Sequence, residues 1–246
     1  FAPRPAAYTA IIRAHTRMPA LKSYIDAAIL QPNLTQQSVQ TALARCLEME
    51  VFSVCVRPCD LVMARQLCSG RATQLGTVLG FPHGLQLSAT KLAEAQQLIA
   101  LGTHELDMVA NYAWALSGEW AAVESEIQEI AATTRAANVI LKVIIETAQL
   151  ETQHLQRFVE ICHRAGANYI KTSTGFNGAG AQYEEVRKLV EFAAGAIKIK
   201  ASGGIRDQAS AQKFIELGVS RLGISWSTCA AILDPSSDIQ AENNAY

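Results

Sequence analysis

Short apolar runs alternate with helical stretches along nearly the whole chain, and this alternation limits the possible folds more than any other feature. The stretches between the runs carry apolar residues at helical spacing, as Leu92, Ala95 and Ile99 do. Eight runs are predicted to be strands: 24–30, 52–56, 75–81, 105–109, 139–145, 169–173, 197–202 and 221–225. Strands that alternate with helices predict a parallel sheet covered by helices.

Eight strand–helix units in 246 residues predict a (β/α)8 TIM barrel, a fold for which about 250 residues is typical. The alternative is an open doubly wound sheet, which more often has a GxGxxG turn after its first strand. A Gln-Pro-Asn turn at 31–33 follows the first strand here and disfavours that fold. We therefore predict a single barrel domain over 1–246, with a helical extension over 1–20 and a flexible tail over 234–246.

Composition excludes several classes of partner. The formal net charge is -1 and 17% of the residues are charged, so the chain has no field that would attract nucleic acid or an anionic membrane. No apolar run approaches the ~20 residues of a membrane span, and the first residues lack a signal-peptide pattern. The six cysteines form no CxxC pair and are typical of free thiols in a reducing compartment. We expect a cytoplasmic protein.

Two lysines, Lys171 and Lys200, each lie near the end of a predicted strand. An ammonium group is costly to bury, and a second one nearby costs more, so one amine is expected to lose its proton. A neutral lysine amine is a nucleophile that forms a Schiff base with a carbonyl. Because the active site of a (β/α)8 barrel lies at the carboxyl ends of its strands, this pair predicts carbonyl chemistry.

The alternation of a strand places further charged residues on the same faces as the two lysines. If these faces point inward, the barrel holds far more charge than a structural core tolerates. The inward set is Asp26, Glu105, Asp107, Lys142, Lys171, Lys198 and Lys200. We expect Glu105, Lys142 and Lys198 to form a charge-paired layer beneath the site. The alternative is that some lysines, Lys198 first among them, face the helices and extend to solvent.

Glycine-rich turns after the last two predicted strands indicate a phosphate site. Loops seven and eight of such barrels often bind phosphate through backbone N–H groups, and glycine lets the backbone approach the anion. Glycines also form ordinary turns, but their presence at both loops favours an anion site. The predicted substrate-binding and phosphate-binding residues are Gly203, Gly204, Ile205, Arg206, Gly223, Ser225, Thr172, Asp26 and Cys55.

Five segments of the chain resemble the signature segments of the deoxyribose-phosphate aldolase family, and they occur in the family's order. They are GFPHG at 80–84, ELDMV at 105–109, KVIIET at 142–147, YIKTSTG at 169–175 and KASGGIR at 200–206. Either lysine segment alone is moderately specific, and the two together are specific. The resemblance extends from about the first strand to the terminal tyrosine.

This resemblance implies a class I aldolase that needs no metal or other cofactor. It would cleave 2-deoxy-D-ribose 5-phosphate to acetaldehyde and D-glyceraldehyde 3-phosphate, and catalyse the reverse reaction. Lys171 matches the family's Schiff-base lysine, and Lys200 matches the second lysine, whose charge keeps the first amine neutral. Asp107 matches the acid/base carboxylate, and Tyr246 matches a C-terminal tyrosine that helps to move a proton. The implied partners are small aldehydes and sugar phosphates, with a homodimer as the expected assembly.

The first strand and the last loop depart from the family's pattern. Asp26 is kept, but Ala27 and Ala28 replace a polar pair, and Gln31 replaces a lysine. Trp226 replaces a small residue. The covalent chemistry is unaffected by these changes, but they predict a weaker hold on a phosphorylated substrate. One hypothesis is therefore a preference for non-phosphorylated aldehydes.

Two other readings of the chain compete with this aldolase. One is another Schiff-base sugar-phosphate aldolase or a transaldolase-like barrel, which would share the fold and the lysine but not both lysine segments. The other is a non-catalytic sugar-phosphate-binding barrel, which would have no use for a neutral lysine.

Cys55 is expected to be a small buried hydrophobic residue, with a reactive thiol at the mouth as the alternative. His83 is expected to shape its loop, with contact to the substrate as the alternative.

Overall fold

The computed structural model describes residues 20–234, which form a closed parallel barrel. Each strand pairs in parallel with the next, and β8 pairs with β1 to close the sheet. The strands are β1 (Ile25–Ile29), β2 (Ser53–Val56), β3 (Gln74–Leu79), β4 (Glu105–Val109), β5 (Ile140–Ile144), β6 (Tyr169–Lys171), β7 (Lys198–Ser202) and β8 (Arg221–Ser225). The predicted (β/α)8 barrel is confirmed, and the open sheet is excluded.

The strand limits differ from the predicted ones by no more than two residues at either end. The largest differences are at β3 and β6, which end two residues earlier than predicted. In β3 the reason is Gly80, whose φ of 62° leaves the extended region. The predicted helical extension falls within residues that lie outside the described part of the chain, apart from Ala20. Tyr246 and the tail after Asp234 also lie outside it.

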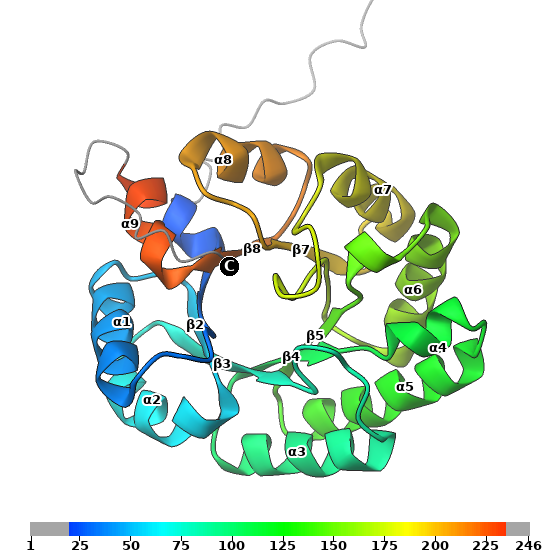
Figure 1. Ribbon diagram of the computed structural model, residues 1–246, viewed down its shortest axis with the longest axis horizontal. Helices are drawn as coiled ribbons and strands as arrows, with labels where there is room; N and C mark the ends of the chain where they lie inside the picture. The colour runs from blue at the N-terminus through cyan, green and yellow to red at the C-terminus, as the bar shows by residue number, and fades with distance from the viewer. Residues whose placement is uncertain (1–19, 235–246) are drawn as a thin grey trace, which may run out of the picture.

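Helices form an outer ring around the strands (Figure 1). No helix within residues 20–234 is both long and apolar enough to cross a membrane. Short 3-10 turns at Leu21–Tyr24, Pro58–Asp60 and Thr147–Gln149 join some of the elements. The helices are α1 (Gln36–Glu48), α2 (Leu61–Cys68), α3 (Ser88–Ala100), α4 (Tyr112–Leu116), α5 (Trp120–Ala136), α6 (Thr152–Ala165), α7 (Tyr183–Ala193), α8 (Gln208–Glu216) and α9 (Trp226–Leu233).

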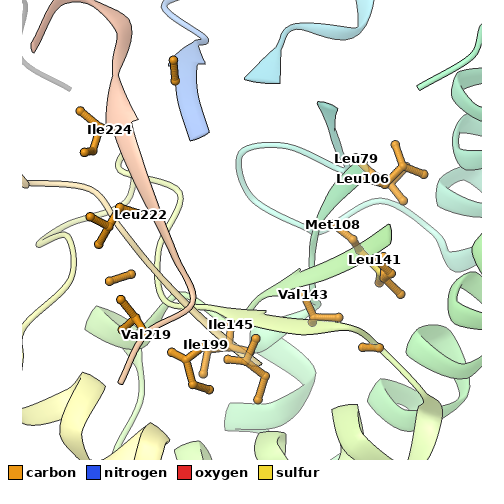
Figure 2. Packing of buried hydrophobic residues seen from close by; sticks show 14 of the residues in the cluster. Leu79, Leu106, Met108, Leu141, Val143, Ile145, Ile199, Val219, Leu222 and Ile224 are labelled. Carbon is orange, nitrogen blue, oxygen red and sulfur yellow. The ribbon is translucent and has the colours of Figure 1, made fainter. Parts of the chain in front are cut away.

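The main hydrophobic core lies between the strands and the ring of helices. Figure 2 shows outward-facing strand residues of this core, including Met108 of β4, Val143 of β5 and Leu222 of β8. These side chains are fully buried, and each contributes about 1.5–3 kcal/mol relative to an exposed side chain. Because the outward faces carry this packing, the inward faces near the carboxyl ends are left for polar residues.

Candidate active site

Asp107 of β4 lies at the centre of the polar residues inside the barrel. Its Oδ2 accepts hydrogen bonds from Lys171 Nζ at 2.9 Å and from Lys200 Nζ at 2.8 Å. Its Oδ1 accepts a hydrogen bond from Lys142 Nζ at 2.8 Å. All four side chains are buried. Strand register explains the arrangement, because Asp107 pairs with Lys142 across β4 and β5, and Lys171 pairs with Lys200 across β6 and β7.

A second group of charges lies around Asp26 and Glu105. Lys200 Nζ is 2.6 Å from Asp26 Oδ2, and Lys142 Nζ is 2.6 Å from Glu105 Oε2. The guanidinium of Arg221 joins these two carboxylates, with Nε 2.6 Å from Asp26 Oδ1 and Nη2 2.9 Å from Glu105 Oε2. Every member of this group is buried, so Asp26 belongs to the ion-pair network beside the lysines.

Arg221 takes the place in this group that was predicted for Lys198, and that prediction is wrong. Lys198 is the exposed first residue of β7, with its Nζ 5.5 Å from the centre of the Tyr169 ring. Register is the reason, because it pairs Lys198 with Tyr169 and Lys200 with Arg221. The sequence signal for Arg221 is the two-residue period of β8, which places Arg221 on the same face as Gly223.

The network joins four cations to three carboxylates within the described residues, and the cations differ in how many carboxylates they contact. Lys142, Lys200 and Arg221 each contact two or more, whereas Lys171 contacts only Asp107. Charging all four cations would therefore leave one buried positive charge unbalanced. Lys171 is the cation with the least support, so it loses its proton at the lowest cost.

The pKa shifts follow from these contacts. Burial, with the nearby Lys200 charge, lowers the pKa of Lys171 below its usual range, even though Asp107 acts in the opposite direction. Burial also disfavours the charged form of Lys200, but Asp107 and Asp26 outweigh it and raise the pKa of Lys200. For Asp107 the effect of burial is outweighed by Lys142, Lys171 and Lys200, which hold its pKa well below the usual range. The site therefore combines an amine of lowered pKa with a carboxylate whose pKa is also lowered.

An apolar cluster faces this network from β1, β2 and β3. It consists of Ala28, Leu30, Cys55 and Val78, with Phe81 packed against it. Cys55 is 4% exposed, and burial raises the pKa of its thiol to about 12. This placement supports the expected small hydrophobic residue at Cys55. The mouth of the barrel thus has one charged side and one apolar side.

A small pocket lies at the carboxyl ends of β7 and β8. Its lining brings together six of the nine predicted substrate- and phosphate-binding residues, without Thr172, Asp26 and Cys55, and adds Thr228. The lining residues are Gly203, Gly204, Ile205, Arg206, Gly223, Ser225 and Thr228. Gly223 has no space for a side chain, because a Cβ there would lie 2.2 Å from Ser202 Oγ. Thr172 lies outside this lining, because its hydroxyl exchanges hydrogen bonds with the backbone of Ser202.

The residues that depart from the family's pattern have different surroundings. Trp226 is buried and lines a separate hollow with Arg45 of α1 and with Met49, which follows that helix. It is absent from the lining of the glycine pocket, so this pocket gives no support to the expectation that Trp226 weakens phosphate binding. Ala28 belongs to the apolar cluster at the mouth, whereas Ala27 packs outward in the main core. Gln31 is buried near the pocket, and its Nε2 donates to Ser225 Oγ at 3.4 Å.

The loop after β6 lies near the barrel mouth in Figure 1. Glu146, which was not predicted as a site residue, accepts hydrogen bonds from the backbone N–H and the hydroxyl of Thr174. Asn177 donates to the Pro82 carbonyl at 2.7 Å, and Phe176 packs edge-on against Phe81 with ring centres 5.1 Å apart. These contacts hold the loops after β3 and β6 together. His83, in the first of these loops, is exposed.

A parallel barrel in which a buried lysine of lowered pKa shares an aspartate with a second lysine has the arrangement expected of a barrel enzyme that acts on carbonyl compounds. A profile described as DeoC/LacD family aldolase matches residues 22–222, and the chain belongs to this family. It is therefore an aldolase.

Individual relatives agree with this assignment. The deoxyribose-phosphate aldolase of Desulfitobacterium hafniense is 38% identical over 205 residues, which is 83% of this chain and 94% of the relative. The solved structure described as QR15, an aldolase, has a TM-score of 0.80 and 38% identity, and covers 85% of this chain and 92% of its own. The tetrameric deoxyribose phosphate aldolase of Aeropyrum pernix has a TM-score of 0.78 and 30% identity, covering 84% and 87%.

Proposed function

We propose that this aldolase reversibly cleaves 2-deoxy-D-ribose 5-phosphate to acetaldehyde and D-glyceraldehyde 3-phosphate, with Lys171 as the Schiff-base lysine. The observation that carries the proposal is the position of Lys171 Nζ. It contacts a single carboxylate, at 2.9 Å, and its strand pairs with β7, which leads into the glycine pocket. The names of the relatives support the choice of substrate.

The chemistry begins at the aldehyde carbon of the open-chain sugar. The neutral amine of Lys171 adds to this carbon and gives a carbinolamine, which loses water to form an iminium. A proton leaves the C3 hydroxyl and the C2–C3 bond breaks, so the bonding electrons move into the iminium and give an enamine. Glyceraldehyde 3-phosphate leaves; protonation of the enamine at C2 and addition of water then release acetaldehyde and restore the amine.

Asp107 and Lys200 are suited to move the protons in these steps. Asp107 Oδ2 lies within hydrogen-bond distance of both Lys171 Nζ and Lys200 Nζ, the reach that proton transfer requires. Lys200 remains an ammonium, so it can donate a proton and disfavour a second charge on Lys171. The role proposed for Tyr246 remains a prediction, since this residue lies outside the described part of the chain.

The substrate is held by opposite sides of the mouth. The apolar cluster of Ala28, Leu30, Cys55 and Val78 suits the hydrocarbon end of the acetaldehyde unit. The pocket after β7 and β8 offers backbone N–H groups and the cation of Arg206 to the phosphate. Asp207 follows Arg206 and caps the N-terminus of α8, where its side chain accepts a hydrogen bond from Ser210 N.

Borohydride trapping tests the covalent step. The protein is incubated with acetaldehyde and sodium borohydride, and its intact mass and peptides are measured. We expect one ethyl group on Lys171, absent in Lys171→Leu and retained in Lys198→Leu, which removes an exposed lysine of the neighbouring strand. Absence of an adduct, or adducts spread over surface lysines, would contradict the proposal and favour a non-catalytic barrel.

The identity of the cleavage products tests the reaction, and a comparison of two sugars tests substrate choice. Release of acetaldehyde and glyceraldehyde 3-phosphate separates this aldolase from a transaldolase-like enzyme. We expect a higher kcat/KM for 2-deoxyribose 5-phosphate than for 2-deoxyribose, because the glycine pocket proposed to bind the phosphate is lined by Arg206 and Trp226 lies outside its lining. A higher kcat/KM for 2-deoxyribose would contradict this expectation and support the hypothesis of a preference for non-phosphorylated aldehydes.

We also propose a homo-oligomer and a cytoplasmic location. The homodimer expected from the sequence remains a prediction, and the related Aeropyrum pernix protein is described as tetrameric. Light scattering on the purified chain distinguishes monomer, dimer and tetramer.

The cytoplasmic location is supported by the free state of the cysteines within residues 20–234, which suits a reducing compartment.

A further inference from the structure

Arg221 is a buried cation that the proposed mechanism does not use. It projects inward from β8, next to Lys200 in the register, and is 4% exposed. Its Nε donates to Asp26 Oδ1 at 2.6 Å, and its Nη2 is 2.9 Å and 3.0 Å from the two oxygens of Glu105. Its Cζ also lies 3.7 Å from the centre of the Phe52 ring. The N–H groups of the Arg221 guanidinium therefore contact two carboxylates, and the guanidinium also packs over the Phe52 ring.

The two carboxylates that Arg221 contacts also serve the lysines of the site. Asp26 is 2.6 Å from Lys200 Nζ and 3.6 Å from Lys142 Nζ, and Glu105 is 2.6 Å from Lys142 Nζ. Without Arg221, the three carboxylates would face three lysines. A protonated Lys171 would then complete the charge balance, whereas with Arg221 present it is the unbalanced fourth cation.

We infer that Arg221 is a positioning residue that keeps the Lys171 amine unprotonated by neutralising part of the charge on Asp26 and Glu105. This inference rests on the proposed function, because it concerns the nucleophilic amine of that reaction. Arg221 acts through the network and does not contact Lys171. Its guanidinium suits the role, since it stays charged at every pH at which the enzyme folds.

The charged and titratable groups that face Lys171 and Arg221 come from several strands of the barrel. The charged or titratable groups around Lys171 are Asp107 of β4, Lys200 of β7 and Cys55 of β2. Those around Arg221 are Asp26 of β1, Glu105 of β4 and Tyr169 of β6. Lys142 of β5 links the two sets through Asp26, Glu105 and Asp107. A change of one charge at Arg221 therefore reaches Lys171 through shared carboxylates.

The experiment measures the rate of borohydride-trapped adduct formation with acetaldehyde as a function of pH. In Arg221→Met we expect the pH midpoint to rise by about one unit, which makes trapping about tenfold slower at a fixed pH below the midpoint. Arg221→Lys keeps the charge, and its midpoint should stay close to that of the unmodified protein. A purely structural role would lower the rate in both variants without moving the midpoint.

Charge-matched variants make the test independent of the stability of Arg221→Met. Glu105→Gln alone removes an anion, so the midpoint should fall. The double variant Arg221→Met/Glu105→Gln removes one charge of each sign, so the midpoint should return toward its original value. An unmoved midpoint in Glu105→Gln, or a double variant no closer to the original than Arg221→Met, would overturn the inference. Absence of a Lys171 adduct in the unmodified protein would instead contradict the proposed function.

Discussion

The alternation of side chains along each strand predicts which of its residues face the inside of the barrel. Asp26, Glu105, Asp107, Lys142 and Lys200 all lie on the predicted inward faces, because successive side chains of a strand point to opposite sides. The alternation does not predict how far along the barrel axis a residue lies. An inward face near the amino end opens to solvent, and this is where Lys198 lies, as the exposed first residue of its strand.

The thiols differ in reactivity according to their burial, and this gives a prediction for Cys55. Burial raises its pKa to about 12, so the reactive thiolate form is disfavoured at pH 8. Cys59 is exposed. We expect an alkylating reagent at pH 8 to label Cys59 in the native protein and to leave Cys55 unmodified, as measured by peptide mass.

A matched pair of variants tests this assignment of reactivity. Cys59→Ser should abolish most of the fast labelling, and Cys55→Ser should leave it unchanged. The Cys55→Ser variant should also be no more resistant to crotonaldehyde than the unmodified protein. Rapid labelling of Cys55 would instead show that it is a reactive thiol at the mouth.

At the scale of elements, the loop after β6 shapes the loop after β7 through close contact of their backbones. A Cβ added at Gly180 would lie 2.2 Å from the carbonyl carbon of Gly203. The N–H of Ala181 also donates to the carbonyls of Ser202 and Gly203. The pocket at β7 and β8 therefore depends on a residue without a side chain in a neighbouring loop, which strand patterns could not indicate.

Substitution of this glycine should affect the phosphate more than the aldehyde. We expect Gly180→Ala to raise the KM for 2-deoxyribose 5-phosphate about tenfold or more, because the backbone of Gly203 must shift. Trapping of acetaldehyde on Lys171 should change little. The control is Ala179→Ser, which adds one atom at an exposed neighbouring position. An equal loss in both reactions of Gly180→Ala would show that the loop acts on the whole site.

A buried ion pair joins two helices of the outer ring to the end of β4. Lys91 Nζ of α3 donates to Glu126 Oε1 of α5 at 2.8 Å and to the Val109 carbonyl at 3.0 Å. Ser88 Oγ donates to the second oxygen of the same glutamate. Asp107 lies two residues before Val109, so this pair anchors the strand that carries the central carboxylate of the site.

Loss of one partner of this pair should destabilise the fold strongly. We expect Glu126→Gln or Lys91→Met to lower the free energy of unfolding by about 3–5 kcal/mol, because a buried charge is left unpaired. The double variant Lys91→Met/Glu126→Leu should recover most of this loss. Urea unfolding measures all three values. A loss under about 1 kcal/mol in the single variants would show that water or other groups replace the missing partner.

At the scale of the whole molecule, the network inside the barrel links stability to pH. Burial would raise the pKa of Asp26, but Lys200, Lys142 and Arg221 outweigh it and lower the pKa below the ordinary value of 3.8. Asp107 is shifted in the same direction, and further. The stability from a carboxylate with a lowered pKa is present above its unfolded value and is lost as the pH falls through the folded one.

We therefore expect the urea midpoint to fall steeply as the pH drops below about 4. The matched control is Asp26→Asn, which should be less stable at pH 7 but should lose stability less steeply in acid, because one of the shifted carboxylates is gone. Identical acid slopes in the two proteins would show that the network does not carry the pH dependence.

Local patterns in the sequence determined the class of the fold, the inward face of each strand, the two lysines and the glycine turns. They did so because the two-residue period of a strand and the conformational freedom of glycine are properties of short segments. Only the tertiary structure decided that Arg221 rather than Lys198 completes the ion pairs, and that Trp226 lines a hollow separate from the glycine pocket after β7 and β8. These outcomes depend on how non-neighbouring strands are staggered around the closed barrel, and no single segment contains that information.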